Sequence, residues 1–483
     1  MRSSLAQAVV CASVLCCGSA ASAQQVIQES IKLTASDGGP GDLFGRSAAI
    51  DGATVVVGAV NADQRGLDAG AAYVFDAITG VQQRRLLAQD GDDEEFFGVA
   101  VGVSGGRVIV GASQNDAADT LAGAAYIFGG PMLRQTDQLL PTSSQPVGPG
   151  FSFSGFSVAI DSSFAVVGAP GDIEITNGGG GAIYVYETGS FNNVQKLFSS
   201  DAAFADNFGT KVAVSGDLVV ASTPFDDDNG TDSGSVYVFD AITGAELRKL
   251  TPSDGDTRDF FGLSIALDGD TLAVGAPFAN NEGGVDAGAV YLFDAATGDE
   301  LRRITPADFS PNGAGEGDVF GFAVDLDGGL LVVGAPRNDE RGDGAGVAYV
   351  FDVASGARLA TLAPSDAATG AAFGGAVGVS DDLIVVAAEG DGQNGEDAGA
   401  AYVFAFVPAP CFADLTTDGL PNGVPDGLIT LSDFSFYLAL WSQSDPAADI
   451  TLAGVCEPSI GGGDGVTLSD FSCYLSLWSQ GGP

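Results

Sequence analysis

One internal repeat constrains the fold of this chain more than any other feature. A Phe-Gly pair, replaced once by Ser154-Gly155, occurs seven times at intervals of roughly 53 to 59 residues. Thirteen residues after each glycine comes an element of small residues, of which Gly275-Ala276-Pro277 is one copy. Each repeat then contains a tyrosine followed by two apolar residues: Tyr73, Tyr126, Tyr184, Tyr237, Tyr291, Tyr349 and Tyr402. A period of this length, held in one register, indicates a repeat architecture.

The fifth repeat shows the expected structure of one unit. Residues 262–267, 271–276, 289–294 and 300–304 read as four strands separated by turns or loops. The second strand is apolar on both faces and must be buried on both, whereas the fourth carries charge and faces water. Four antiparallel strands per unit describe a propeller blade. The sequence therefore predicts an all-β, seven-bladed β-propeller over residues 24–407.

An N-terminal strand is expected to close the ring. The seventh repeat has its third strand at 400–406 but then continues into Val407-Pro408-Ala409-Pro410, so its fourth strand is missing. Residues 30–37, SIKLTASD, resemble residues 247–254, LRKLTPSD, which form a fourth strand and its exit. We expect residues around 26–34 to complete the seventh blade and to leave no open edge.

The Phe-Gly and Gly-Ala-Pro elements resemble the FG-GAP repeats of integrin α-subunit propellers and their bacterial relatives, over about residues 42–404. Integrin-type repeats that bind Ca²⁺ carry an Asp-x-Asp-x-Asp-Gly-like loop between the two elements. The turn here is as short as Asp51-Gly52 or Asp268-Gly269-Asp270, too short to supply six or more oxygens. Calcium binding is therefore not carried over to these turns.

The long loops are expected to gather on one face of the disc, together with the links between blades. Each long loop contains at least two acids, and binding residues concentrate on loops held by a rigid scaffold. We expect this face to contact a partner through Asp63, Asp68, Asp226, Asp227, Asp228, Asp232, Asp339, Asp343, Asp391 and Asp397. Solvated turns without a partner are the alternative interpretation.

Composition excludes several functions. The chain has no histidine, which excludes His-based acid–base chemistry and imidazole metal sites. Its formal net charge is −45 at pH 7, a balance that repels nucleic acid and anionic lipid. Such a surface either maintains solubility or collects Ca²⁺ or basic partners.

The N-terminus has the layout of a secretory signal peptide over residues 1–23. Arg2 precedes an apolar run at 6–17, and Ala21-Ser22-Ala23 supplies a cleavage site before Gln24. No other run is long and apolar enough to span a bilayer, so we expect a secreted or cell-surface protein without a membrane span.

Residues 408–483 form a linker and a second, shorter repeat. Phe434, Tyr437, Leu438 and Trp441 fall at i, i+3, i+4 and i+7, and a second copy follows, which predicts two short amphipathic helices. EF-hand-like loop positions are Asn422, Asp426, Thr430 and Asp433, then Asp464, Thr467 and Asp470. The layout resembles a dockerin, which implies possible Ca²⁺ binding at these residues and a cohesin-like partner. Cys411, Cys456 and Cys473 allow one internal disulfide at most, with its pairing open.

Three functions remain. The first is an exported, non-enzymatic binding or adhesion module for an extracellular protein or glycan, anchored or assembled through its dockerin-like tail. The second is an extracellular, polysaccharide-active propeller enzyme that uses paired carboxylates at the central channel. The third is a structural spacer.

Overall fold

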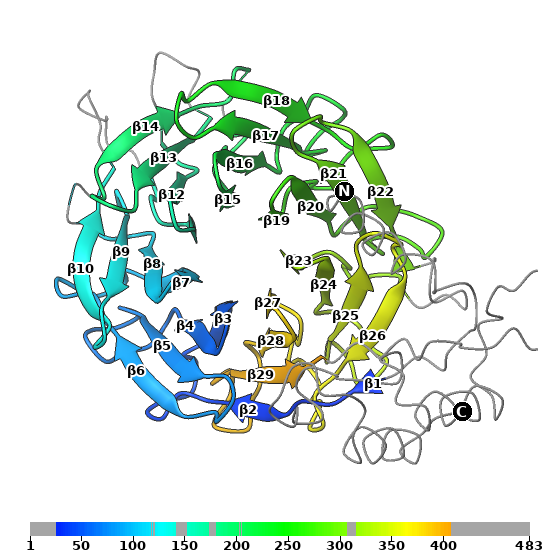
Figure 1. Ribbon diagram of the computed structural model, residues 1–483. Helices are drawn as coiled ribbons and strands as arrows, with labels where there is room; N and C mark the ends of the chain where they lie inside the picture. The colour runs from blue at the N-terminus through cyan, green and yellow to red at the C-terminus, as the bar shows by residue number, and fades with distance from the viewer. Residues whose placement is uncertain are drawn as a thin grey trace, which may run out of the picture. The chain divides into compact units, whose positions relative to one another are not determined.

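A ring of seven β-sheets makes up the described part of the chain (Figure 1). The computed structural model describes residues 26–116, 118, 121–141, 152–172, 180–201, 203, 205–306 and 315–406. These residues lie in the unit Gln24–Phe406, one of two compact units into which the chain divides. The predicted signal peptide, the predicted C-terminal helices and all seven candidate calcium ligands lie outside the described residues. The described residues confirm the predicted seven-bladed propeller.

The first three blades follow the chain order from the inner to the outer edge. Blade one contains β3 (Phe44–Asp51), β4 (Thr54–Ala59), β5 (Ala71–Asp76) and β6 (Gln82–Leu86). Blade two contains β7 (Phe97–Ser104), β8 (Arg107–Ala112), β9 (Ala124–Gly129) and β10 (Arg134–Leu139). Blade three contains β11 (Ser157–Ile160), β12 (Phe164–Ala169), β13 (Ala182–Glu187) and β14 (Asn193–Leu197).

The remaining blades repeat this order, and two of them include an N-terminal strand. Blade four contains β15 (Val212–Ser215), β16 (Leu218–Thr223), β17 (Ser235–Asp240) and β18 (Glu246–Leu250). Blade five contains β19 (Ser264–Asp268), β20 (Thr271–Ala276), β21 (Ala289–Asp294) and β22 (Glu300–Ile304). Blade six contains β23 (Ala323–Asp327), β24 (Leu330–Ala335), β25 (Val347–Asp352), β26 (Arg358–Leu362) and β1 (Val26–Ile27). Blade seven contains β27 (Ala376–Ser380), β28 (Leu383–Ala388), β29 (Ala400–Ala405) and β2 (Ile31–Leu33).

Three of the four strands predicted for blade five agree with the structure residue by residue. The exception is the first strand, which begins at Ser264 rather than at the glycine of the Phe-Gly pair. Phe260 and Gly262 both have positive φ, at 52° and 94°, and the Leu263 amide donates to the Phe260 carbonyl at 3.1 Å. Gly262 and Leu263, which the sequence pattern places in the strand, therefore belong to this tight turn.

The N-terminal strand closes the ring as predicted. β2 pairs antiparallel with β29, with Ile31 opposite Val403 and Leu33 opposite Ala401. The expected strand is however too long at its start, because Val26–Ile27 do not belong to blade seven. They pair in parallel with Thr361 and Leu362 of β26, on the outer edge of blade six (Figure 1). The N-terminal segment therefore joins two neighbouring blades.

The repeated motif forms the contacts between blades. Phe97 of blade two makes a parallel bridge to Gly70 of blade one, and its amide donates to the Ala69 carbonyl at 3.0 Å. Its buried ring contacts Tyr126 and Phe128 of its own blade, with centroids 5.5 and 6.0 Å away. Blade three keeps the same bridge, from Gly123 to Ser154, although serine replaces the phenylalanine. The backbone contact therefore defines the repeat, and the aromatic ring reinforces it.

Candidate functional site

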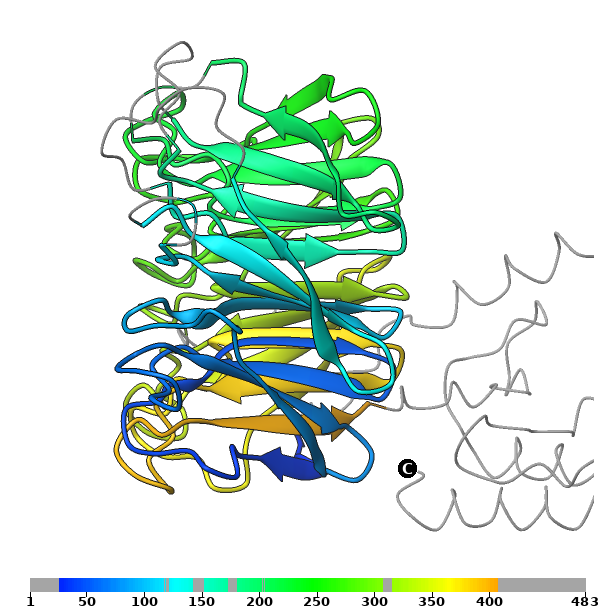
Figure 2. The same cartoon turned by 90° about the vertical axis from the view of Figure 1, so that its left-hand side faces the viewer.

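The long loops and the links between blades lie on one face of the disc, named here the loop face (on the left in Figure 2). Backbone hydrogen bonds join them: the Glu94 amide of a link donates to the Leu67 carbonyl of a loop at 2.7 Å. The same contact recurs in blade four, where the Arg258 amide donates to the Thr231 carbonyl at 2.8 Å. Each loop is thus fixed to the start of the next blade.

Eight of the ten acids predicted for this face have at least partly exposed side chains. Asp63, Asp227, Asp228, Asp339, Asp343 and Asp397 are exposed, and Asp68 and Asp232 are half-buried. Several of them also shape their own loops. The carboxylates of Asp63, Asp227 and Asp339 each accept a hydrogen bond from the amide five residues later, at 2.7 to 2.9 Å. The loop face is therefore acidic and locally ordered.

The other two predicted contact residues, Asp226 and Asp391, lie beneath the face. These two residues are only 3% and 2% exposed. The hydroxyl of Tyr402 donates to the Asp391 carboxylate at 2.9 Å, and the hydroxyl of Tyr237 donates to Asp226 at 3.2 Å. A lysine pairs with each carboxylate at 3.0 Å. These two acids support the loops from below and do not present a contact surface.

A lysine–tyrosine–aspartate cluster recurs in three blades. Lys32, Lys196 and Lys249 lie on outer strands, with each ammonium 5.1 to 5.4 Å from the centre of a tyrosine ring. Each also pairs with a loop aspartate at 3.0 to 3.2 Å. The aspartates are Asp172, Asp226 and Asp391, whereas the equivalent positions of the other blades are Ala62, Asn115, Ala279 and Asn338. A lysine on the outer strand and an aspartate in the loop occur together in these three blades, and this pairing is the sequence signal for the cluster. The repeat alignment alone did not identify the cluster.

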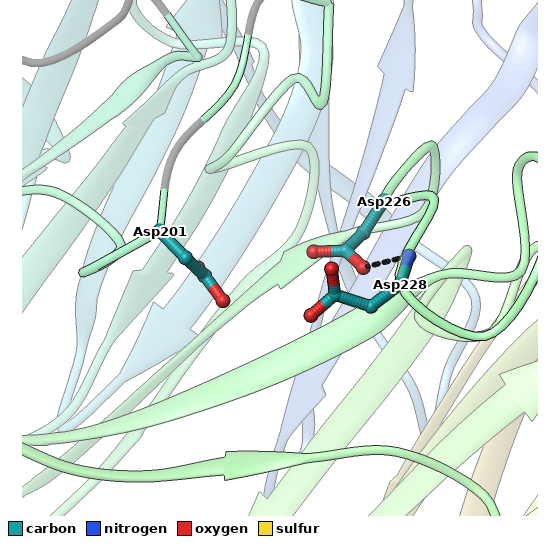
Figure 3. Close-up of side chains that lie close together, drawn as sticks. All are labelled: Asp201, Asp226 and Asp228. Atoms are coloured by element: carbon teal, nitrogen blue, oxygen red, sulfur yellow. Dashed lines mark hydrogen bonds between the residues drawn. The ribbon is translucent and has the colours of Figure 1, made fainter.

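Three carboxylates of blade four lie close enough together to hold a cation (Figure 3). Within the described ranges, Asp201, Asp226 and Asp228 bring one oxygen each to within 4.8 Å of one another. The ammonium of Lys249 lies among them, at 2.7, 3.0 and 2.5 Å. Burial lowers the pKa of Lys249, but hydrogen bonds to Asp201 and Asp228 outweigh it and the net pKa is raised. The protein's own cation therefore lies within this cluster and offsets one of its three negative charges.

A second set of acids is buried under the links, two residues before five of the six Phe-Gly pairs. Its members are Asp42, Glu95, Asp206, Asp259 and Asp318, each less than a tenth exposed. Burial raises the pKa of all five, to about 7 for Glu95 and about 6 for Asp259. The Glu95 carboxylate accepts a hydrogen bond from the Asn115 side-chain amide at 2.8 Å. These side chains order the links, and sequence reasoning did not single them out.

The central channel bears on the enzymatic alternative. Inverting and retaining glycosidases generally need two carboxyl groups at the scissile bond. The cavity at the ring centre, among the residues the structure describes, has one carboxylate in its lining, Asp325. Its oxygen accepts a hydrogen bond from the Val379 amide at 2.7 Å. The described lining thus offers no carboxylate pair for such a reaction.

Seven blades of antiparallel strands with one loop-rich face define a β-propeller. The FG-GAP repeat family model matches residues 27–75, 81–128, 191–239, 245–293, 304–351 and 357–404. These matches cover more than half of the chain, which therefore belongs to the FG-GAP repeat family. Each match begins near an outer strand and ends at the third strand of the next blade. Residues 129–190, which contain the first three strands of blade three and Ser154 in place of phenylalanine, lie in no match.

The chain was also compared with curated proteins and with solved structures. No curated protein matches the chain. The crystal structure of the computationally designed Ika8 protein is similar at 16% identity and a TM-score of 0.43, over 78% of this chain and 100% of the design. Within the described residues, no helix has the length and hydrophobicity needed to cross a bilayer.

Proposed function

We propose that this protein is a non-enzymatic binding or adhesion module that contacts an extracellular protein or glycan through the loop face. The observation that supports the proposal most directly is the construction of this face. Exposed acidic loops are hydrogen-bonded to the links and rest on a closed ring of buried strands. A rigid scaffold that presents variable loops is a common arrangement for recognition. The net negative charge favours a ligand with basic or cation-bridged groups.

The proposal extends to both ends of the chain. Residues 1–23 act as a signal peptide, so that the protein is secreted or remains at the cell surface. Residues 408–483 act as a dockerin-like anchor that binds Ca²⁺ through Asn422, Asp426, Thr430, Asp433, Asp464, Thr467 and Asp470, and joins a cohesin-like partner. Sequence patterns alone support these two parts. Calorimetric Ca²⁺ titration of the full chain and of an Asp426→Asn/Asp433→Asn variant tests the first loop, because the variant should lose that binding event.

A binding screen with matched charge variants tests the loop face. The full mature chain is applied to an array of glycans and extracellular proteins, and any ligand found is titrated against two variants. The first replaces three exposed acids of the loop face, Glu340, Asp343 and Glu396, by lysine. The second replaces three exposed acids of the turns on the opposite face, Asp217, Asp270 and Asp382. We expect at least tenfold weaker binding in the first variant and little change in the second. Equal loss in both variants would contradict a contact on the loop face.

A further inference from the structure

A cavity of about 850 Å³ is lined mainly by the first strands of the blades. These strands surround the centre of the ring (Figure 1). All seven blades contribute to its lining. Its volume falls in the range of roughly 300–1,000 Å³ that is usual for small-molecule sites. Gln114, Gly171 and Phe225, at the starts of long loops, contribute to the lining, but none of the acids proposed as contact residues does.

The walls of the cavity are mostly apolar. Small aliphatic side chains from the first strands, such as Ala48 and Ala159, form much of the lining. The lining also includes the aromatic residues Phe153, Phe156, Phe225 and Phe322. Phe156 is 37% exposed, a high value for an aromatic side chain within a ring of buried strands. These walls favour a ligand with an apolar body.

The charged side chains of the lining have a net positive formal charge, opposite in sign to the charge of the whole chain. The lining includes Arg46 and Lys211, against a formal net charge of −45 for the chain. Of the four lysines, three belong to the lysine–tyrosine–aspartate clusters, and Lys211 is the fourth. No ion pair joins the Lys211 ammonium to a residue that the structure describes. Lys211 is thus exposed to the cavity while protein surrounds it.

The two other charged side chains of the lining do not neutralise Lys211. Burial and the nearby positive charge of Arg46 lower the pKa of Lys211 to about 8. Arg46 pairs with Glu389 at 3.4 Å, and both of these side chains are partly exposed, so the pair is weak. Asp325 accepts from the Val379 amide, and burial raises its pKa to about 7. Two cations without a full counter-charge therefore share one apolar cavity.

We propose that the cavity binds a small organic anion with an apolar body, a carboxylate or sulfonate whose charged group pairs with Lys211 and Arg46. Charge-assisted hydrogen bonds from both cations would hold the anionic group, and the aromatic and aliphatic walls would bury the apolar body. A neutral ligand of the same shape would gain the apolar contacts alone.

Fluorescence titration with 8-anilinonaphthalene-1-sulfonate, an anionic aromatic probe, tests the proposal on the full mature chain. We expect saturable binding at one site that depends on the cavity cations. Lys211→Met should weaken this binding about tenfold and Arg46→Met about threefold, whereas Arg107→Gln, at an exposed cation outside the lining, should leave it unchanged. The neutral probe N-phenyl-1-naphthylamine should bind the wild type and the Lys211→Met variant equally. Dodecanoate should displace the anionic probe, and dodecanol should not.

Thermal melts show whether each variant is folded, so that a loss of binding can be attributed to the substituted side chain. Lys211→Met removes a charge from an apolar cavity, so the variant should melt at or above the wild-type temperature. The proposal is overturned if the anionic probe does not bind, if it binds a folded Lys211→Met variant with wild-type affinity, or if dodecanol competes as well as dodecanoate.

Discussion

The Cα atom of Gly58 in blade one lies directly against the carbonyl oxygen of Gly98 in blade two. A Cβ atom on Gly58 would stand 2.0 Å from that oxygen. The same contact joins Gly111 to Gly155 at 1.9 Å and Gly275 to Gly321 at 2.0 Å. The glycine of the Gly-Ala-Pro element of one blade thus packs on the glycine of the next Phe-Gly pair. This contact explains why the two short motifs recur together along the chain.

We expect Gly275→Ala to destabilise the propeller by about 1–3 kcal/mol, because the new methyl group would overlap the backbone of the next blade. The φ of Gly275 is not in the left-handed region, so the cost is steric. Urea unfolding followed by circular dichroism measures it. Gly189→Ala is the matched control, since a Cβ at Gly189 meets nothing within 4 Å. A similar loss of stability in both variants would contradict the role assigned to the contact.

Removal of residues 24–36 should lower the melting temperature substantially. The deletion removes β2 and leaves the outer edge of β29 without its antiparallel partner. It also removes Lys32, which pairs with the buried Asp391 at 3.0 Å. Removal of residues 24–28 alone takes away only the two parallel pairs of β1 and should cost less. Scanning calorimetry of the two truncated proteins decides the question, and equal melting temperatures would count against closure by β2.

Lys249→Met should destabilise blade four by about 1–3 kcal/mol. The substitution leaves the Asp226 carboxylate, only 3% exposed, without its cation. The double variant Lys249→Met/Asp226→Asn should recover part of the loss, because the uncompensated charge is removed with its partner. A double-mutant cycle in urea measures the coupling between the two side chains. Strict additivity of the two single substitutions would show that they do not interact.

Glu95→Gln should stabilise the propeller in a pH-dependent manner. The folded-state pKa of Glu95 is raised to about 7 from 4.5, chiefly by burial. The folded state therefore binds more protons than the unfolded state between about pH 4.5 and 7, and the stability contributed by this group falls as the pH rises through that window. We expect a gain of about 1–3 kcal/mol for the variant at pH 8 and little gain at pH 4.5.

Asp76→Asn provides a control of opposite sign for this pH dependence. Hydrogen bonds from the amide and side chain of Thr79 lower the pKa of Asp76. The stabilisation from the Asp76 carboxylate is present above its pKa in the unfolded state and is lost as the pH falls. Asp76→Asn should therefore destabilise the propeller at pH 8 and have little effect in acid. Melting temperatures from about pH 2 to 8 compare the two variants, because the contribution of Asp76 is lost only below its unfolded pKa of 3.8. A gain from Glu95→Gln that is the same at every pH would contradict the assigned titration.

Local patterns in the chain were enough to predict the blades. The strands at 271–276, 289–294 and 300–304 agree with β20, β21 and β22, because burial on one or both faces leaves a clear apolar pattern. Blade three was also predicted, although serine replaces the phenylalanine of its Phe-Gly pair. The fixed spacing of Ser154-Gly155 preserves the backbone bridge to Gly123, and the blade depends on that bridge.

The surroundings of the charged side chains could not be predicted in this way. Asp226 and Asp391 belong to the same acidic loops as Asp227 and Asp397, yet the first two are buried beside lysines and the second two are exposed. The sequence pattern likewise did not predict that β1 pairs in parallel with blade six. It also did not predict that Arg46 and Lys211 both line the central cavity.

The chain's own periodicity was thus sufficient for the number of blades, three of the four strands of blade five and closure by β2, because each blade repeats the same local burial and turn chemistry. Only the closed ring determines whether a charged side chain pairs with another residue, faces solvent or lines the central cavity. The physical reason is that the solvation and pairing of a side chain depend on neighbours from distant parts of the chain, which come together only when all seven blades have packed.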